Sequence, residues 1–496
     1  MSVLLGLDVG TGGARCVAVD ESGEVVAEAS SEYPLSSPRP GWSEQAPEDW
    51  WRATKEVLGR VASEVEGEIS GLGLTGQMHG SVFLDSSDEV IRPALLWNDQ
   101  RTQEQCARIT AAVGKERLVQ ISGNPALTGF QAPKVLWLRD NEPDLYEKTS
   151  RILLPKDYIR LKLTGEYATD ASDAAGTLLL DMRSRDWSAE ILEALEIPEE
   201  WMPKVYEGPE KTGELRKEVA EELGLPAGLP VAAGGGDNAA AAVGTGIVSE
   251  GLLSSSVGTS GVLFAHTDTF SPEPSGRLHA FCHAVPDAYH LMGVTLSAGG
   301  SLSWWRETLG KGYDELVEAA GKVPPGSEGP LFLPYLSGER TPHLDPGARG
   351  AFFGLTTRHT TAHMTRALME GVIFSLRDSL EIMGELGVEA REIRATGGGA
   401  KSPLWRQLQA DIYGRPIYRT ASEEGPAYGA ALLGGISSGV YGSVKDASSL
   451  VKLREEVTEP DRESARLYGE HYEVYRSLYP ATREAMSRLT DLAAKT

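Results

Sequence analysis

The chain has 496 residues, of which 41% are hydrophobic and 24% are charged, and its formal net charge is −24. This length predicts two to four domains, with a core that needs no disulfide or metal to hold it together. The acidic balance excludes broad nucleic-acid binding, which requires a basic surface. No apolar run approaches the ~20 residues of a membrane helix, and neither paired cysteines nor a signal peptide is apparent, so a cytoplasmic protein is expected.

The first predicted element is a β-hairpin over residues 4–20, with Asp8 at the end of its first strand. Three glycines surround Thr11 in the turn, and they allow backbone N–H groups to point at one spot, as a bound phosphate requires. A carboxylate beside a phosphate is a suitable ligand for Mg²⁺, so we expect Asp8 to hold the metal. The turn by itself leaves open a surface hairpin whose glycines only reverse the chain.

A helix over residues 48–65 and a strand over residues 69–74 lead into the segment Thr75-Gly76-Gln77-Met78-His79-Gly80. Ligand contacts gather where the strands of α/β folds pass into loops. The amide of Gln77 and the imidazole of His79 can donate and accept hydrogen bonds, which suits a hydroxylated ligand, and Met78 can supply an apolar wall. A purely structural histidine is the alternative.

A polar cluster, Asn98-Asp99-Gln100-Arg101, follows a strand over residues 94–97 and precedes a helix over residues 102–112. Asp99 is suited both to bonding the hydroxyls of a ligand and to capping that helix, and the sequence leaves the two roles open. Helices and short turns then alternate through residues 154–170, which indicates a lid inserted in the first half of the fold.

Asp237 lies between a glycine turn at residues 234–236 and a predicted helix over residues 238–243. Its carboxylate should stand free at the helix N-terminus, where the helix dipole lowers the pKa and keeps the group ionised. An ionised carboxylate can accept a proton during a reaction. Aspartate is also a favoured N-cap residue, and the two roles are compatible.

Residues 253–265 repeat the first hairpin at an offset of half the chain length, with Ser256 in the place of Asp8. A self-match at that distance indicates a duplicated fold. We therefore predict two α/β lobes around a central cleft, residues 1–245 and residues 246–496, with the glycines of residues 244–251 as their hinge.

The second lobe offers several candidate nucleotide contacts. Gly258, Thr259 and Ser260 should present N–H and hydroxyl donors to the terminal phosphates. The bare backbone of Gly398 and Gly399, between a strand and a helix, can lie against a flat purine.

Two further segments of the second half carry weaker predictions. Residues 297–301 open a helix and either line the nucleotide site or cap that helix. Residues 468–488 predict an amphipathic closing segment that is broken or bent at Pro480.

These motifs resemble those of the FGGY family of carbohydrate kinases, whose two lobes share the ribonuclease H-like fold of actin and hexokinase. The resemblance covers essentially the whole chain and is greatest to the xylulokinase branch. The segments that carry it are Leu7-Asp8-Val9-Gly10-Thr11, Thr75-Gly76-Gln77-Met78-His79-Gly80, Trp97-Asn98-Asp99-Gln100-Arg101-Thr102, Gly235-Gly236-Asp237-Asn238-Ala239, Val257-Gly258-Thr259-Ser260, Gly397-Gly398-Gly399-Ala400 and Gly425-Pro426-Ala427-Tyr428-Gly429-Ala430-Ala431.

The resemblance implies an α/β kinase with two ribonuclease H-like lobes that uses ATP and Mg²⁺. The catalytic residues would be Asp8, at the metal, and Asp237, the base that accepts the proton. The residues implied at the sugar are Met78, His79, Asp99, Asp237 and Asn238, and those at the nucleotide are Thr11, Arg15, Gly258, Thr259, Ser260, Gly398 and Gly399. Gly12 stands where a serine is common in the family, which leaves Thr11, Arg15 and backbone donors to bind phosphate, and Gln131 stands where a small residue is usual.

The expected reaction is transfer of the γ-phosphate of ATP to a ketopentose, D-xylulose, at its terminal hydroxyl, which gives D-xylulose 5-phosphate. Because a fold does not determine a substrate, a kinase for ribulose, glycerol or gluconate is an alternative. A nucleotide switch of the actin type is the alternative from another class, but it has no need of Met78, His79 and Asp237 together. No nucleic-acid or membrane partner is expected, and a homodimer is left open.

Overall fold

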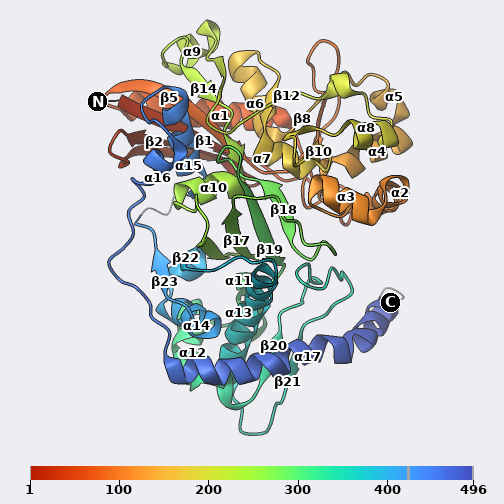
Figure 1. The fold of residues 1–496 in the computed structure, drawn as a ribbon, viewed down its shortest axis with the longest axis vertical. Helices are drawn as coiled ribbons and strands as arrows, with labels where there is room; N and C mark the ends of the chain where they lie inside the picture. The colour runs from red at the N-terminus through yellow and green to blue at the C-terminus, as the bar shows by residue number, and fades with distance from the viewer. Residues whose placement is uncertain (1, 422–424, 494–496) are drawn as a thin grey trace.

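Two mixed β-sheets form the centres of two lobes in the structure, a computed structural model that describes residues 2–421 and 425–493 (Figure 1). The strands of the first sheet are β1 (Ser2–Val9), β2 (Gly13–Asp20), β3 (Val25–Glu32), β5 (Glu68–Gly76), β13 (Lys211–Glu214), β14 (Pro230–Ala232) and β15 (Gly235–Gly236). Their order is β13-β14-β5-β1-β2-β3, and β15 pairs with β5. The first three strands form an antiparallel meander, whereas β5 is parallel to β1 and β14 is parallel to β5.

The second sheet repeats this arrangement. Its strands are β16 (Leu252–Val257), β17 (Gly261–Thr267), β18 (His279–Cys282), β19 (Tyr289–Thr295), β22 (Glu392–Thr396) and β23 (Ile417–Arg419), in the order β18-β19-β17-β16-β22-β23. β16, β17 and β19 form the antiparallel meander, and β22 and β23 are the parallel strands beside β16. The duplicated α/β fold predicted from the repeated hairpin is therefore confirmed.

Each sheet is covered by a helix whose apolar side faces it. α1 (Pro47–Glu64) packs on β2 and β3 and buries Trp50, Val57 and Val61, residues that lie on one side of a helix. α13 (Thr361–Glu385) packs on β17 and β19 of the second sheet. Because helices cover these strands, β1 carries the nearly continuous run of buried apolar residues typical of a sheet with two covered faces.

Two helices join the lobes. α15 (Gly425–Ser437) comes from the second half of the chain but packs on β1 and β5 of the first sheet, where its blue ribbon lies among red strands (Figure 1). α10 (Asp237–Gly244) ends the first half and packs against α15. Every strand of the first sheet comes before β16, with which the second sheet begins. The helices do not follow this division, because α15 comes from the second half of the chain and packs on the first sheet.

Glycines allow this junction to pack closely. A Cβ atom added at Gly73 in β5 would lie 1.7 Å from the carbonyl oxygen of Ala430 in α15. A Cβ atom at Gly429 in α15 would lie 1.8 Å from the carbonyl oxygen of Ala240 in α10. The two helices and the first sheet therefore touch through bare backbone, and a larger residue at either glycine would push them apart.

An additional layer of helices and short strands is inserted between β5 and β14. Its apolar core includes Phe130, Leu136 and Leu178, and it continues onto Phe281 and Met292 of the second sheet. The inserted elements are β6 (Val82–Leu84), β7 (Ala94–Leu95), α2 (Gln103–Val113), α3 (Lys115–Ser122), α4 (Gln131–Asn141), α5 (Pro143–Tyr146), β8 (Arg151–Leu153), α6 (Pro155–Thr164), β9 (Ala168–Asp170), α7 (Ala171–Ala174), η1 (Ala175–Thr177), β10 (Leu180–Asp181), β11 (Asp186–Trp187), α8 (Ala189–Leu195), η2 (Glu199–Trp201) and β12 (Lys204–Tyr206).

The second lobe closes with α17 (Arg462–Ala493), which buries Tyr468, Tyr472 and Tyr475. This helix continues through Pro480, so of the break or bend expected there the break is wrong. The remaining elements are β4 (Glu44–Gln45), α9 (Lys217–Leu223), α11 (Gly299–Leu309), α12 (Tyr313–Gly321), η3 (Pro325–Glu328), β20 (Leu331–Leu333), β21 (Ala351–Phe353), η4 (Gly398–Lys401), α14 (Pro403–Tyr413) and α16 (Val444–Ser448). In the part of the chain that the structure describes, no helix combines the length and the apolar character that crossing a bilayer requires.

Candidate active site

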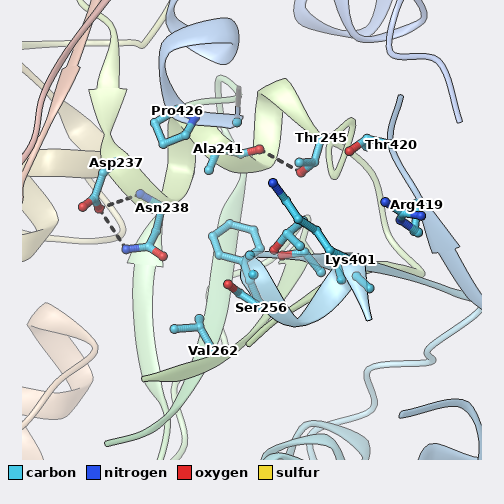
Figure 2. Close-up of a pocket in the computed structure, with 18 residues that line it drawn as sticks. Asp237, Asn238, Ala241, Thr245, Ser256, Val262, Lys401, Arg419, Thr420 and Pro426 are labelled. Atoms are coloured by element: carbon cyan, nitrogen blue, oxygen red, sulfur yellow. Dashed lines mark hydrogen bonds between the residues drawn. The ribbon is translucent and has the colours of Figure 1, made fainter. Parts of the chain in front are cut away.

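Asp237 is held by one of its two carboxylate oxygens. The backbone N–H and the side-chain amide of Asn238 donate to Oδ1 at 2.7 and 2.8 Å (Figure 2). Within residues 2–421 and 425–493, no group donates a hydrogen bond to Oδ2. Asp237 is the first residue of α10, and Gly236 occupies the N-cap position.

The pKa of Asp237 differs from the expectation. Burial raises it to about 6, and the two hydrogen bonds from Asn238 lower it only in part. The prediction of a lowered pKa is therefore wrong, because the loss of solvent around a partly buried carboxylate outweighs the stabilisation that a helix N-terminus provides.

Asp8 lies close enough to Asp237 for the two charges to interact. Burial and the charge of Asp237 raise the pKa of Asp8 to about 7, and the charge of Arg15 opposes that rise. The Oδ1 atom of Asp8 is buried without a hydrogen-bond partner among the described residues. The two carboxylates predicted to share one site are thus neighbours, and each has an oxygen to which no described residue donates.

Met78 and His79 lie next to this pair. The side chain of Met78 is buried against Gly236, where an added Cβ atom would come within 2.8 Å of its Cγ. His79 has a φ of 69°, and its Nδ1 lies 2.6 Å from the carbonyl oxygen of Gly176. Burial lowers the pKa of His79 to about 3, so this imidazole is neutral. The structure therefore brings both residues to the side of the turn that carries Asp237.

The hydroxyl of Thr11 is used within the first lobe. It donates to Oε1 of Gln77 at 3.2 Å and accepts from Nε1 of Trp97 at 2.9 Å. Gln45, which sequence reasoning missed, donates to the carbonyl oxygen of Thr11 at 2.7 Å. Because a hydroxyl has a single donor hydrogen, Thr11 in this conformation offers a phosphate only its backbone N–H.

Arg15 stands on the strand that follows the hairpin turn. Its guanidinium forms a 2.8 Å ion pair with Glu28 of the neighbouring strand, and both side chains are exposed. Its charge also acts on the carboxylate of Asp8. Arg15 is thus near the first carboxylate, but in this conformation it is engaged at the surface of the sheet.

Asp99 does not face a ligand. It is fully buried, and its oxygens accept hydrogen bonds from the backbone N–H of Ser43 and from the backbone and guanidinium of Arg101. The expectation that Asp99 bonds a sugar is therefore wrong, because its lone pairs are used inside the protein. It does not cap α2 either, since Thr102 precedes that helix and no side chain caps it.

Four of the predicted nucleotide residues line one cavity of about 790 Å³ in the second lobe. Its walls include Gly258, Thr259, Gly398 and Gly399, but not Ser260. The carbonyl of Ser260 instead accepts from the backbone N–H of Gly258 at 3.0 Å and shapes the turn.

The start of α11 also reaches this cavity, through Gly299 and Ser303. No side chain caps the helix, which begins after Ala298. The sequence predicts that residues 297–301 either cap this helix or line the nucleotide site. The structure rules out the cap and places Gly299 in the wall of the cavity. The backbone N–H of Gly299 donates to the carbonyl of Gly258 at 2.8 Å, which ties the helix to the glycine turn.

A second cavity, of about 510 Å³, connects the nucleotide residues with Asp237 (Figure 2). Asp237 and Asn238 form its wall on the first lobe, and Ser256 and Gly397 lie on the second. Both cavities are lined by Gly398 and Lys401. The two cavities therefore adjoin at the glycine loop, and the one beside the first lobe reaches Asp237.

A buried ionic network supports the turn before Asp237, and sequence reasoning assigned three of its members, Lys156, Asp157 and Asp170, only to a lid. The ammonium group of Lys156 lies 2.6 Å from Asp157, 2.8 Å from Asp170 and 3.3 Å from Asp173, and none of these side chains is exposed. Asp170 also binds Ser172, whose hydroxyl accepts from the backbone N–H of Gly236 at 3.1 Å. The network thus fixes the residue that precedes Asp237.

Comparison with known proteins finds relatives over nearly the whole chain. Models of the FGGY family of carbohydrate kinases match the chain twice, the N-terminal domain over residues 3–244 and the C-terminal domain over residues 253–438. The chain is 43% identical over 478 residues to the xylulose kinase of Escherichia coli (strain K12), an alignment that covers 96% of this chain and 98% of that protein. It is 29% identical over 505 residues to the gluconokinase of Bacillus subtilis (strain 168), which covers 99% of this chain and 98% of that protein.

The structure of a further protein shares the fold. The crystal structure of xylulose kinase from Rhodospirillum rubrum matches with a TM-score of 0.92 and 30% sequence identity, and the match covers 98% of this chain and 99% of that one. The two family models together span most of the sequence, and the duplicated sheets account for the pair of domains. The chain therefore belongs to the FGGY family of carbohydrate kinases.

Proposed function

We propose that this chain transfers the γ-phosphate of ATP to the terminal hydroxyl of D-xylulose and releases D-xylulose 5-phosphate and ADP. The observation that carries the proposal is the half-paired carboxylate of Asp237, which lines a cavity together with the glycine loop of the second lobe. The relative from Escherichia coli, a xylulose kinase at 43% identity over 96% of this chain, supports the choice of sugar.

Asp237 is the proton acceptor in this reaction. As the terminal oxygen of the sugar forms its bond to the γ-phosphorus, the bond from that phosphorus to the bridging oxygen of ADP breaks, and the hydroxyl proton passes to Oδ2 of Asp237. Asn238 orients the carboxylate by holding Oδ1. With a pKa of about 6, most of the carboxylate is ionised at pH 7 and can accept a proton. The raised pKa also makes it a stronger base than an ordinary aspartate.

Asp8 fits a role as metal ligand. Its Oδ1 is buried and unpartnered, and the neighbouring charge of Asp237 disfavours its ionised form. Among the described residues there is no group of three or more metal-ligating side chains, so the phosphates and water would supply the other ligands of a metal held here. Asp8 would hold Mg²⁺, which neutralises phosphate charge when it is bound with ATP.

The sugar is proposed to lie between Asp237 and the segment that carries Met78 and His79. Met78 supplies an apolar surface beneath the turn at Gly236, and the neutral His79 supplies a hydrogen-bonding ring nitrogen. Asn238 lines the same cavity as Asp237. A carbohydrate presents both C–H faces and hydroxyls, so an apolar wall beside polar groups matches its surface.

The nucleotide is proposed to occupy the cavity at the glycine turns, with its base near Gly398 and Gly399 and its phosphates near Gly258 and Thr259. The γ-phosphate would then lie on the side of Lys401, which lines both cavities, and point toward the sugar. We also propose that the protein acts in the cytoplasm, where ATP is available as the donor.

Release of ADP, followed over a panel of acceptors, tests the proposal. D-xylulose should give the highest kcat/KM among D-xylulose, D-ribulose, glycerol and gluconate, and ADP release without sugar should be slow. A preference for gluconate, which the Bacillus subtilis gluconokinase relative makes the main competitor, would overturn the choice of substrate. Rapid ADP release that no acceptor stimulates would indicate a nucleotide switch instead of a kinase.

A further inference from the structure

We propose that Arg340, a residue of the second lobe, binds the sugar at the end opposite the hydroxyl that receives the phosphoryl group, and that it selects among acceptors. The inference rests on the proposed function and adds a specificity residue to it. Sequence reasoning did not single out Arg340.

The backbone around Arg340 is fixed to the edge of the second sheet. The N–H of Thr341 donates to the carbonyl of Val294 at 3.0 Å, and the Thr341 hydroxyl accepts from the Val294 N–H at 3.1 Å. In the same sheet, His279 of β18 pairs with Met292 of β19, two residues before Val294. Thr341 therefore hydrogen-bonds to β19 just beyond the point where β18 ends. Arg340, the residue before Thr341, lies beside this end of β18, whose first residue is His279.

Glu339 holds the same segment from its other side. This buried carboxylate accepts from the Thr295 hydroxyl at 2.6 Å, from the Leu296 N–H at 3.1 Å and from the backbone N–H of Arg340 at 2.7 Å. A guanidinium on a backbone held by both neighbours is well placed for recognition, because little ordering is left to be done when a ligand binds.

The guanidinium of Arg340 has no acceptor of its own. Within residues 2–421 and 425–493, no oxygen accepts a hydrogen bond from it and no carboxylate forms an ion pair with it. It is half-buried, and burial lowers its pKa although the charge of Glu339 opposes that effect. A half-buried cation with five donors and no acceptor is costly unless something else supplies the oxygens. The cost points to a ligand.

Ring packing brings the segment around Arg340 to one end of the proposed sugar site. The Phe130 ring lies 4.9 Å from the ring of His79 and 6.0 Å from the ring of His279, measured between centroids. The charge of Arg340 lowers the pKa of His79 and of His279. The charges that act on Asp8 are instead those of Asp237 and Arg15. The charge of Arg340 is not among the causes of the pKa shifts of Asp8 and Asp237, which agrees with a place at the imidazole end of the site. Arg340 is therefore better placed to contact the end of the sugar opposite the reacting hydroxyl than to contact the phosphoryl group.

His79 and Arg340 have complementary hydrogen-bonding roles. Nδ1 of His79 lies 2.6 Å from the Gly176 carbonyl, so this nitrogen carries the hydrogen of the neutral ring and Nε2 keeps a lone pair. A guanidinium can only donate. The carbonyl end of a ketopentose offers a ketone oxygen, which can only accept, beside a hydroxyl, which does both. Arg340 therefore donates to these two oxygens, O1 and O2, and the hydroxyl can donate to His79.

Aromatic rings complete this end of the site. The His79 ring lies 4.9 Å from the Phe130 ring and 6.1 Å from the Phe281 ring, between their centroids. Phe130 belongs to the inserted layer and Phe281 to the second sheet. A sugar held by Met78 and His79 on one side and by Arg340 on the other thus bridges the two lobes.

Steady-state kinetics of the full-length Arg340→Gln variant test the inference. The KM for D-xylulose should rise about 10- to 100-fold, as expected for loss of a charged hydrogen bond, while the KM for ATP stays unchanged. The loss should be smaller with 1-deoxy-D-xylulose, which lacks O1, and with xylitol, in which an alcohol replaces the ketone. Arg358→Gln, at an exposed arginine paired with Glu328, is the matched control and should behave as wild type.

Thermal unfolding of each variant reports whether it is folded. If Arg340→Gln does not fold, Arg340→Lys keeps the charge but not the planar fork, and it should raise the KM for D-xylulose by less than the glutamine would. An unchanged KM for D-xylulose in a folded variant would overturn the inference, as would an equal loss for all acceptors and for ATP. If the wild type itself does not phosphorylate D-xylulose, the proposed function is wrong; if it does and Arg340→Gln matches it, only the role of Arg340 is wrong.

Discussion

Asn238 donates hydrogen bonds from its backbone N–H and its side-chain amide to a single oxygen of Asp237, so the second oxygen is the one that can take a proton. Asp237→Asn keeps the shape of the side chain and removes that acceptor. The kcat for sugar phosphorylation should fall by ~10²–10⁴, while the affinity for a nonhydrolysable ATP analogue should stay the same. Turnover assays and calorimetric titration measure the two effects, and a variant with near-normal kcat would rule out Asp237 as the base.

Asn238→Ala should change the pH dependence of the reaction. A hydrogen bond to an ionised carboxylate lowers its pKa, so loss of the side-chain donor should raise the pKa of Asp237 above its present value of about 6. The acidic limb of the kcat/KM profile should then move to higher pH, since the base is protonated over a wider range. A profile with the same acidic limb as the wild type would show that this amide does not act on the base.

Gly73→Ala should destabilise the junction of the lobes. The new Cβ would lie 1.7 Å from the Ala430 carbonyl, so α15 must move away from the first sheet. We expect a loss of about 3 kcal/mol or more in the free energy of unfolding, measured with urea. Gly384→Ala is the control, because a Cβ there meets no atom within 4 Å and alanine favours a helix. A Gly73→Ala protein as stable as the control would contradict the packing described here.

Lys156→Met should be among the most damaging substitutions. It removes the cation from three buried carboxylates and leaves Arg160, 3.6 Å from Asp157, as their remaining partner. Breaking such a network costs about 3–5 kcal/mol. Because Asp170 and Ser172 hold the turn before Asp237, the kcat of any folded variant should fall as well.

The control for Lys156 is Lys217→Met. Lys217 is exposed, and its nearest carboxylate oxygen, in Glu221, is 3.7 Å away. Exposed pairs contribute little, so this variant should lie within about 1 kcal/mol of the wild type. If chemical denaturation gave equal losses in the free energy of unfolding for Lys156→Met and Lys217→Met, the buried network would contribute no more to stability than an exposed ion pair.

His290→Phe should make the protein more tolerant of acid. Burial and the nearby His266 lower the pKa of His290 to about 3, whereas an unfolded histidine titrates near 6.5. Below that pH the unfolded chain binds a proton that the folded chain does not, so His290 reduces stability as the pH falls. Phenylalanine keeps the stacking on Phe264, whose ring centroid is 4.2 Å away.

The comparison of two pH values isolates this effect from other titrating groups. The quantity to compare at each pH is the free energy of unfolding of His290→Phe against that of the wild type. The variant should gain about 2 kcal/mol more stability over the wild type at pH 5 than at pH 8. Urea titrations at the two values measure it. A difference between the proteins that does not depend on pH would mean that His290 is not held neutral.

Local patterns were sufficient for much of the fold. The paired hairpins at Asp8 and Ser256 are short-range features of turn glycines and alternating apolar residues, and their repetition led to the duplicated sheets that the structure shows. The crossing of α15 onto the first sheet was not predictable in this way. It depends on glycines in β5 that make contact with residues more than 350 positions away in the chain.

The candidate site divides in a similar manner. Asp237, Met78 and His79 follow strand ends, which is where the α/β pattern places ligand contacts, and the structure brings them together. Asp99 occupies a comparable place in the sequence, yet Ser43 and Arg101 surround it. A strand end indicates that a side chain is near the site, but it does not indicate which groups from distant segments have already taken its lone pairs.

The amino-acid sequence by itself determined that this chain is a duplicated α/β protein with glycine turns beside acidic groups, because those features depend on neighbours along the chain. Only the tertiary structure decided which acids are free, how burial sets the pKa of Asp237, and that the guanidinium of Arg340 has no acceptor among the described residues. Solvent exclusion and charge interactions depend on distances through space, and folding sets those distances between residues that are far apart in the sequence.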